Sequence, residues 1–217
     1  MKRIFTTVVV IALASLFLFK GFFRFNSTSP SKVLPYYGMK EVTSSGDSLY
    51  HMVPPFSFIN QEGRIVTQKD LDGSIYIADY FFCTCQSICP IMSNEMEFLA
   101  NHFKTDSLIK FISHTVNPEN DSVPVLADYA KAHHANPAQW FLVTGDKKEL
   151  YDLARTGYMI SADSGDGGPN DFIHSQNFAL VDKEKHIRGF YDGTNHQDML
   201  KLIEDVEILK KEYQSLE

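Results

Sequence analysis

The chain has 217 residues, of which 44% are hydrophobic and 22% charged, so its composition is that of a globular protein and excludes a disordered one. The formal net charge is −7 at pH 7. Four basic residues and no acidic residue fall in the first 24 positions, which leaves 16 basic and 27 acidic residues for the rest of the chain. Such an acidic body lacks the basic face that nucleic-acid binding requires, so we expect no nucleic-acid partner.

The N-terminus predicts a membrane anchor. The basic pair Lys2-Arg3 precedes sixteen uncharged residues, Ile4–Phe19, and the apolar character resumes soon afterwards up to Phe25. A helix over 4–25 would be roughly 33 Å long, enough to cross a hydrocarbon core of about 30 Å. The alternative is a cleaved signal peptide. We favour the uncleaved anchor, because the small-residue sequence Ala12-Leu13-Ala14 lies inside the apolar run.

We expect three parts in the chain: a membrane anchor over 1–25, a tether and lead-in segment over 26–50, and a folded domain over 51–217. The sequence NSTSPSK over 26–32 is polar and turn-rich, as in a short tether. The basic start stays on the inner side, so the domain faces outward. Because the Arg- and Ser-rich pattern of a mitochondrial import signal is missing, we expect a single-pass protein of a bacterial inner membrane with its domain in the periplasm.

Strand and helix signals alternate through the domain. The first strong signal, over 74–82, is a β-branched and aromatic run typical of a buried strand, and Pro90 then opens a helix that runs to about residue 103. The later signals are a strand over 108–116, a helix opened by Pro124, a strand over 140–144, a helix over 147–156, a Gly/Asp/Pro-rich loop over 161–170, a hairpin of strands 178–181 and 187–191, and a final helix marked by residues 200–209. This order predicts an α/β domain on the thioredoxin-like plan, with a largely parallel central sheet, helices on both faces and an antiparallel edge.

All three cysteines lie within seven residues, Cys83–Cys89, which indicates local chemistry rather than disulfides between distant loops. Cys85 and Cys89 lie between the predicted strand and the start of the helix, where unpaired backbone N–H groups and the helix dipole favour a thiolate. Their spacing lets both sulfurs point to one side, close enough to form a disulfide or to share a metal ion. The alternatives are small buried side chains or one inert disulfide. Cys83 could be a further ligand, a resolving thiol or a small core residue, and we favour the last.

Four sequence motifs resemble a known family. FFCTCQSICPIM, VNPEND, FIHS and YDGT, spread over about Pro54–Ile208, are similar to the Sco/SenC family of thioredoxin-like, membrane-anchored copper proteins. The resemblance implies that Cys85, Cys89 and His174 bind one copper ion per monomer, as Cu(I) or Cu(II). It also implies delivery of copper to the copper-binding subunit of cytochrome c oxidase, and a thiol reductant as a second partner.

Two positions depart from the family pattern. The family often has Asp directly before its histidine, where this chain has Ile173, which leaves Asp171 as the nearest acid. The stretch that usually reads DPERD is here Asn117–Asp121. We expect both changes to affect the tuning of the site rather than copper binding itself.

From the residues alone, His174 is one of eight histidines. It follows the predicted loop and directly precedes the strand 178–181, and in thioredoxin-like folds the loop entering that strand faces the cysteine turn. Two thiolates and one imidazole suit copper, whereas structural zinc normally has four protein ligands. We expect the other histidines to be structural. Asp79, in the strand before the cysteines, is either a proton acceptor for the thiols or a hydrogen-bonded structural residue, and we favour the latter.

Three functions fit these features. The first is a copper chaperone, and the second is a thiol–disulfide oxidoreductase, with Cys85 and Cys89 catalytic, that keeps the acceptor's copper-ligand cysteines reduced. The third is a non-catalytic interaction module that presents aromatic residues such as Phe172 or Tyr191. Dithiol oxidoreductases of this fold usually carry Cys-x-x-Cys, and this chain has one residue more between its cysteines. We therefore favour the chaperone and keep the oxidoreductase as the alternative.

Overall fold

The computed structural model describes residues 33–161, 165, 168, 171, 173 and 175–214, which belong to one compact unit, Val33–Glu217. The anchor predicted for 1–25, the tether up to residue 32 and most of the loop over 161–170 lie outside the described residues. Within the described ranges, no helix combines the length and the apolar character needed to cross a membrane.

The described part of the chain alternates strands and helices. In chain order its elements are β1 (Lys40–Val42), β2 (Ser48–Tyr50), β3 (Ser57–Asn60), β4 (Ile65–Thr67), the 3-10 helix η1 (Gln68–Leu71), β5 (Ile75–Phe81), α2 (Cys89–His102), β6 (Ile109–Thr115), α3 (Val123–Ala132), β7 (Trp140–Thr144), α4 (Lys147–Asp152), the π-helical turn η2 (Leu153–Gly157), β8 (Asn177–Val181), β9 (Ile187–Asp192) and α5 (His196–Gln214). The strands and helices predicted from residue 74 onward are confirmed, within a few residues at their ends.

The main sheet has seven strands in the order β4-β3-β7-β6-β5-β8-β9. Only the three central strands, β5, β6 and β7, run parallel, whereas β3, β4, β8 and β9 pair antiparallel with their neighbours. The sheet is therefore mixed, and the expectation of a largely parallel sheet is wrong. The β3–β4 hairpin adds a second antiparallel edge that the sequence pattern did not indicate, because its strands are short and partly exposed.

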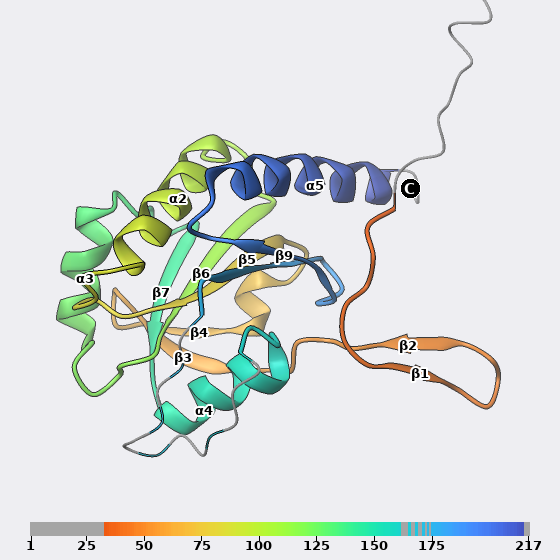
Figure 1. The fold of residues 1–217 in the computed structure, drawn as a ribbon, viewed down its shortest axis with the longest axis horizontal. Helices are drawn as coiled ribbons and strands as arrows, with labels where there is room; N and C mark the ends of the chain where they lie inside the picture. Colours follow the sequence, from red (N-terminus) through yellow and green to blue (C-terminus); the bar gives the residue numbers. More distant parts are fainter. Residues whose placement is uncertain are drawn as a thin grey trace, which may run out of the picture. The chain divides into compact units, whose positions relative to one another are not determined.

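Two apolar layers cover the two faces of the sheet. All seven residues of β5 are buried, and they alternate between the faces: Ile77 and Phe81 pack with α2, α3 and α5, and Tyr80 packs with α4 and η2. Figure 1 shows α2 and α5 on one side of the sheet and α4 on the other. A central strand that is buried on both faces reads as a continuous hydrophobic run, as the sequence over 74–82 does.

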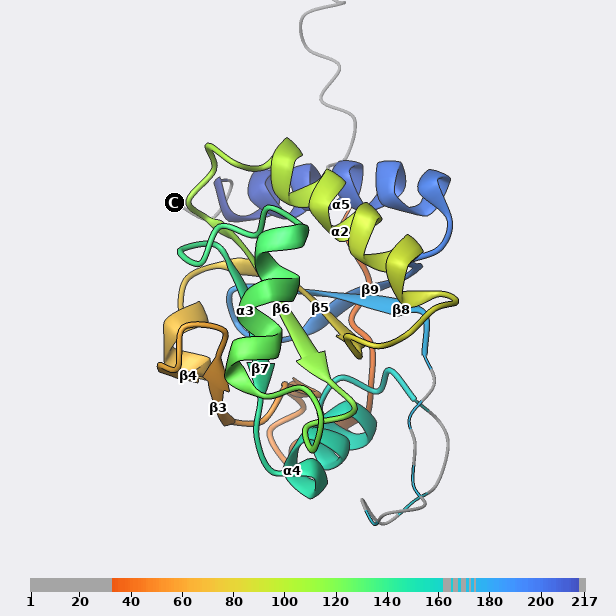
Figure 2. The same cartoon turned by 90° about the vertical axis from the view of Figure 1, so that its left-hand side faces the viewer.

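Parallel pairing brings the ends of the central strands to one edge of the sheet. Phe81 at the end of β5 lies opposite Thr115 at the end of β6, so the segment leading to α2 and the segment leading to α3 leave the sheet as neighbours. Figure 2 shows these two connections beside the N-terminal ends of both helices. Cys83 and Cys85 lie on the first connection, Cys89 begins α2, and Asp121 lies on the second connection.

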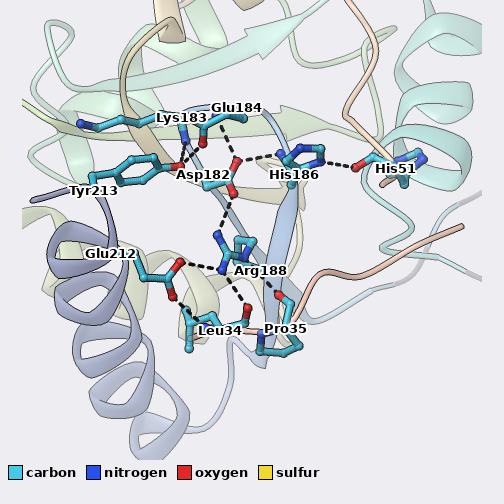
Figure 3. A network of polar contacts seen from close by, with 10 residues as sticks. All are labelled: Leu34, Pro35, His51, Asp182, Lys183, Glu184, His186, Arg188, Glu212 and Tyr213. Atoms are coloured by element: carbon cyan, nitrogen blue, oxygen red, sulfur yellow. Dashed lines mark hydrogen bonds and ion pairs between the residues drawn. The ribbon is translucent and has the colours of Figure 1, made fainter. Parts of the chain in front are cut away.

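A buried arginine fixes the start of the domain. The Arg188 guanidinium, on β9, is 2% exposed and donates to the carboxylates of Asp182 (2.9 Å) and Glu212 (2.8 Å) and to the carbonyls of Leu34 (2.7 Å) and Pro35 (3.1 Å), as Figure 3 shows. Glu212 also accepts from the backbone N–H of Leu34 (2.7 Å). Leu34 and Pro35 are therefore fixed to β9 and α5. They precede the exposed β1–β2 hairpin, which the sequence pattern did not indicate.

Candidate metal centre

The cysteine segment is a tight connection between a buried strand and a helix. β5 ends at Phe81, and the backbone N–H of Cys85 turns back to donate to the Phe82 carbonyl (3.3 Å). The helix α2 begins at Cys89, with Pro90 in its first turn, where the missing N–H of proline leaves no hydrogen bond unmade. Cys89 is therefore the first residue of the helix, and Cys85 lies in the turn just before it.

Cys85 and Cys89 are brought together as free thiols. The Cys85 side chain is partly exposed, and its Sγ lies 3.5 Å from the Ser87 Oγ, with which it forms a hydrogen bond. Cys89 is 4% exposed and packs against the core beneath α2. The Cys85 sulfur is thus accessible and has a hydroxyl group beside it, whereas the Cys89 sulfur is shielded.

These surroundings make the two thiols unequal. Burial alone would raise the pKa of Cys85, but the hydrogen bonds from Ser87 and Cys89 lower that pKa to about 7. Burial, together with the hydrogen bond to Cys85, raises the pKa of Cys89 to about 12. At neutral pH, Cys85 is therefore a thiolate in a large fraction of the molecules, while Cys89 keeps its proton.

Cys83 has a different environment. Its backbone N–H donates to the Asp121 carboxylate (3.2 Å), which also accepts from the Thr115 hydroxyl (2.5 Å). Burial and the nearby Asp121 carboxylate raise the pKa of the Cys83 thiol well above its usual range. Cys83 packs against the same core as Cys89 but is only partly buried. Among the three thiols, Cys85 alone has a pKa near neutrality.

His174 lies outside the described residues, so the structure does not test it as a ligand. Its chain neighbours are described: Ile173 is buried in the core (2% exposed), and the Ser175 hydroxyl donates to the Ile160 carbonyl (3.0 Å). Asp171, named from the sequence as the nearest acid, forms an ion pair with Arg155 (2.6 Å). The part of the chain that the structure describes contains no group of three His, Cys, Asp or Glu side chains placed to hold a metal ion.

The seven described histidines all contact other parts of the protein. His133 and His134 face Glu97, His196 pairs with Glu95, His51 bonds to the Gly157 carbonyl, His186 to the His51 carbonyl and His114 to the Asp79 carbonyl, and the ring of His102 contacts Phe103. These contacts agree with the structural role expected for them.

Asp79 lies within the core on the α2 side of the sheet. It is 2% exposed, and burial raises its pKa to about 7 although the Ser113 side chain hydrogen-bonds to it. The Ser113 hydroxyl also accepts from the Trp140 indole N–H (2.9 Å). Asp79 is therefore a buried carboxyl group whose Oδ1 lacks a hydrogen-bond partner within the described residues, and its negative charge contributes to the raised pKa of Cys89.

Sequence reasoning missed two residues beside the thiols. Ser87 hydrogen-bonds to Cys85, and nothing in a Cys-Gln-Ser-Ile-Cys sequence indicates which of the intervening side chains points at a sulfur. Asp121 closes the Asn117–Asp121 stretch noted from the family pattern, but its contact with Cys83 crosses between two loops 38 residues apart. Only the three-dimensional arrangement shows this contact.

The comparisons with known proteins agree with these features. The SCO1/SenC family model matches residues 45–209. A SCO1 protein homolog of Bacillus subtilis is 30% identical over 162 residues, which cover 74% of this chain and 83% of that protein. A solved structure of BsSco, described as a member of the Sco family of cytochrome c oxidase assembly proteins with a disulfide switch, is 28% identical with a TM-score of 0.62 and covers 73% of this chain and 93% of that one.

A more distant structure supports the fold. Arabidopsis thaliana ScoI, solved with copper bound, is 24% identical with a TM-score of 0.58, and the alignment covers 72% of this chain and 98% of that one. The family model spans most of this chain, and the Bacillus subtilis relative is covered over most of its length. The chain therefore belongs to the SCO1/SenC family.

Proposed function

We propose that this protein is an extracytoplasmic copper chaperone in which Cys85, Cys89 and His174 bind copper and deliver it to the copper centre of a respiratory oxidase. The main observation behind the proposal is the pair of free thiols at the start of α2: Cys85 has a pKa of about 7, and Cys89 is shielded from solvent. Relatives add support: one is an oxidase assembly protein with a disulfide switch, and another holds copper.

Copper is the cargo of this reaction, and the thiols suit it. Thiolate sulfur and imidazole nitrogen are donors that copper prefers over harder metals. Cys85 offers a thiolate to incoming copper at neutral pH, because its hydrogen bonds stabilise the charge. Cys89 loses its proton on joining the site, so copper binding should release protons. A site with three protein ligands leaves a coordination position open for a ligand atom of the protein that receives the copper. Copper can then pass to that protein by ligand exchange.

Redox state would control capture. A disulfide between Cys85 and Cys89 consumes both sulfur donors, so only the reduced protein can hold copper through them. A thiol reductant outside the membrane is therefore part of the proposal. It restores the two thiols by thiol–disulfide exchange, in which the reductant becomes the disulfide.

The test is copper analysis of the full chain purified in detergent. We expect about one copper per reduced monomer, little in the oxidised protein, and little in Cys85→Ser, Cys89→Ser or His174→Ala. His102→Ala is the matched control, because His102 contacts only the neighbouring Phe103 ring among the contacts described for it, and it should bind like the unaltered protein. Stoichiometric copper in His174→Ala would refute the ligand set.

A second function, thiol–disulfide oxidoreductase, is favoured by the unequal thiols. An exposed thiolate attacks a substrate disulfide, and a shielded thiol then resolves the mixed disulfide. Here Cys85 would attack and Cys89 would resolve. Under this function, His174→Ala keeps full turnover on a mixed-disulfide substrate while Cys85→Ser abolishes it; under the chaperone function, His174→Ala loses copper.

We also propose that residues 1–25 hold the domain at the outer face of a bacterial inner membrane, with 26–32 as the tether. The support is the charge and apolar pattern of the sequence. The protein should stay in the membrane fraction after alkaline carbonate extraction, and alkaline phosphatase fused after residue 32 should be active. Release by carbonate, or an inactive fusion, would contradict the anchor or its orientation.

A further inference from the structure

Asp121 joins the cysteine segment to the neighbouring loop. The backbone N–H of Val116 donates to the Phe81 carbonyl (2.8 Å), so the two segments leave the sheet together. Asp121 is 0% exposed, and its Oδ2 accepts from the backbone N–H of Cys83 at 3.2 Å and from the Thr115 hydroxyl at 2.5 Å. A buried carboxylate on one loop thus fixes the backbone of the other, two residues before Cys85.

The Cys83 thiol lies near the same carboxylate, which contributes to the raised pKa of that thiol. The other oxygen of Asp121, Oδ1, is buried, and no donor reaches it within the described residues. A buried carboxylate with one unsatisfied oxygen is costly, so the two donors to Oδ2, one of which is the Cys83 N–H, are needed to hold it in place. Cys83 is therefore held to the neighbouring loop at its backbone N–H.

Cys85 and Cys89 are tied differently. The Cys85 Sγ lies 3.5 Å from the Ser87 Oγ in the turn before α2, and Cys89 is the first residue of that helix. The three cysteines are thus divided into one whose backbone is bonded to Asp121 and two that belong to the turn and the start of α2. Sequence distance does not make this division, because all three cysteines lie within seven residues and loops of this size close readily.

We propose that Asp121 determines which two of the three cysteines exchange, by tying Cys83 to the loop after β6 and leaving Cys85 and Cys89 as the working pair. The proposal rests on the proposed function, in which this pair binds copper when reduced and forms a disulfide when oxidised. Asp121 acts here as a positioning residue, because it reaches the pair only through Cys83.

The reaction that reports on this division is oxidation by a small disulfide such as oxidised glutathione. A cysteine thiolate attacks one sulfur of the reagent, forms a mixed disulfide and releases one glutathione thiol. A second cysteine then displaces the other glutathione, after giving up its proton. Two electrons pass from the two cysteines to the reagent, and one protein disulfide replaces one glutathione disulfide. One cysteine is left reduced, and its identity shows which pair reacted.

The test uses the full chain in detergent. Reduced protein is oxidised with one equivalent of oxidised glutathione, and the remaining thiol is blocked with iodoacetamide. Reduction and labelling with N-ethylmaleimide follow, and fragmentation mass spectrometry then locates each label. We expect the iodoacetamide label on Cys83 in the unaltered protein. In Asp121→Ala, the iodoacetamide label on Cys85 and Cys89 should rise about fivefold or more, the change expected from losing one hydrogen bond.

Two further variants keep the test decisive if Asp121→Ala does not fold. Asp121→Asn keeps an acceptor for the Cys83 N–H but loses the charge, and Thr115→Val removes the other donor to the carboxylate; both should shift the label in the same direction by a smaller factor. Asp205→Asn is the matched control, because Asp205 is a buried carboxylate that accepts from the Tyr191 hydroxyl (2.9 Å) on another part of the sheet. It should leave the label on Cys83.

A Cys83 disulfide in the unaltered protein would overturn the proposal, as would an unchanged label pattern in every folded Asp121 and Thr115 variant. The copper content of the reduced protein is measured on the same samples. Normal copper binding with an unchanged label pattern rejects the role of Asp121 alone. If the reduced protein binds no copper, the chaperone function is rejected, and the role of Asp121 is still judged from the label pattern.

Discussion

Replacing Ser87 by alanine should make Cys85 less acidic. The Ser87 side chain is exposed, so its loss leaves the core intact, and its hydroxyl lies 3.5 Å from the Cys85 Sγ. Burial acts to raise the pKa of Cys85, and the hydrogen bonds that lower it to about 7 include this one. Since one hydrogen bond contributes about 1 kcal/mol and 1.36 kcal/mol corresponds to one pKa unit, we expect the pKa to rise by roughly 0.5 to 1.

The rate of alkylation follows from this pKa. At pH 6, a thiol with a pKa of about 7 is ionised in about one molecule in ten, against about one in a thousand for a thiol at 9.0. Its lower basicity reduces its intrinsic nucleophilicity by about six- to tenfold. Cys85 should therefore react about tenfold faster than an ordinary cysteine at pH 6. In Ser87→Ala the rate should fall about two- to threefold.

The assay is the initial rate of iodoacetamide addition to Cys85, followed by mass spectrometry between pH 5 and 9. Ser93→Ala is the control, because the Ser93 hydroxyl bonds to the Tyr129 hydroxyl (2.7 Å) and makes no contact with Cys85 among those described. A midpoint near pH 9 for the unaltered protein would refute the reasoning. So would equal rates at pH 6 for the Ser87→Ala variant and the unaltered protein.

Three further predictions concern stability. Arg188→Met removes the cation that forms ion pairs with the carboxylates of Asp182 and Glu212 and should lower the free energy of unfolding by about 3–5 kcal/mol in urea titrations; a loss below 1 kcal/mol would contradict the buried network. Burial lowers the pKa of His114 from 6.5 to about 3, so only the unfolded chain takes up this proton as the pH falls from 6.5 towards 3. Between pH 6.5 and 4.5 the unaltered protein should therefore lose about 2–3 kcal/mol more than His114→Phe, and parallel stability curves would refute this. In Gly145→Ala the new Cβ would lie 2.7 Å from the Phe58 ring, so the free energy of unfolding, measured by thermal unfolding, should fall by about 1–3 kcal/mol. An unchanged free energy of unfolding would show that the ring moves aside freely.

The fold was predictable where strands are buried on both faces. β5 appears in the sequence as a continuous apolar run because its residues alternate between two cores, and α2 is marked by Pro90 and helical spacing. The first four strands escaped prediction because they have three or four residues each and are largely exposed, so their hydrophobic pattern is weak. Of these strands, β3 and β4 join the main sheet and add its second antiparallel edge.

The site was predictable as far as its local geometry. Clustered cysteines between a strand and a helix indicate a thiolate site, and the structure places Cys85 in the turn after β5 and Cys89 at the first residue of α2. The unequal acidity of the thiols was not predictable, because it depends on burial beneath α2 and on donors whose directions are set by the turn. The role of Asp121 depends on the parallel pairing of β5 and β6, which no local pattern contains.

X-ray absorption of copper bound to the reduced full chain is the sharpest test of the proposed ligand set, because it counts the donor atoms around the metal. We expect two sulfur neighbours and one imidazole nitrogen, with the nitrogen lost in His174→Ala and both sulfurs retained in Cys83→Ser. A copper with three sulfur neighbours, or with an imidazole that persists in His174→Ala, would contradict this ligand set.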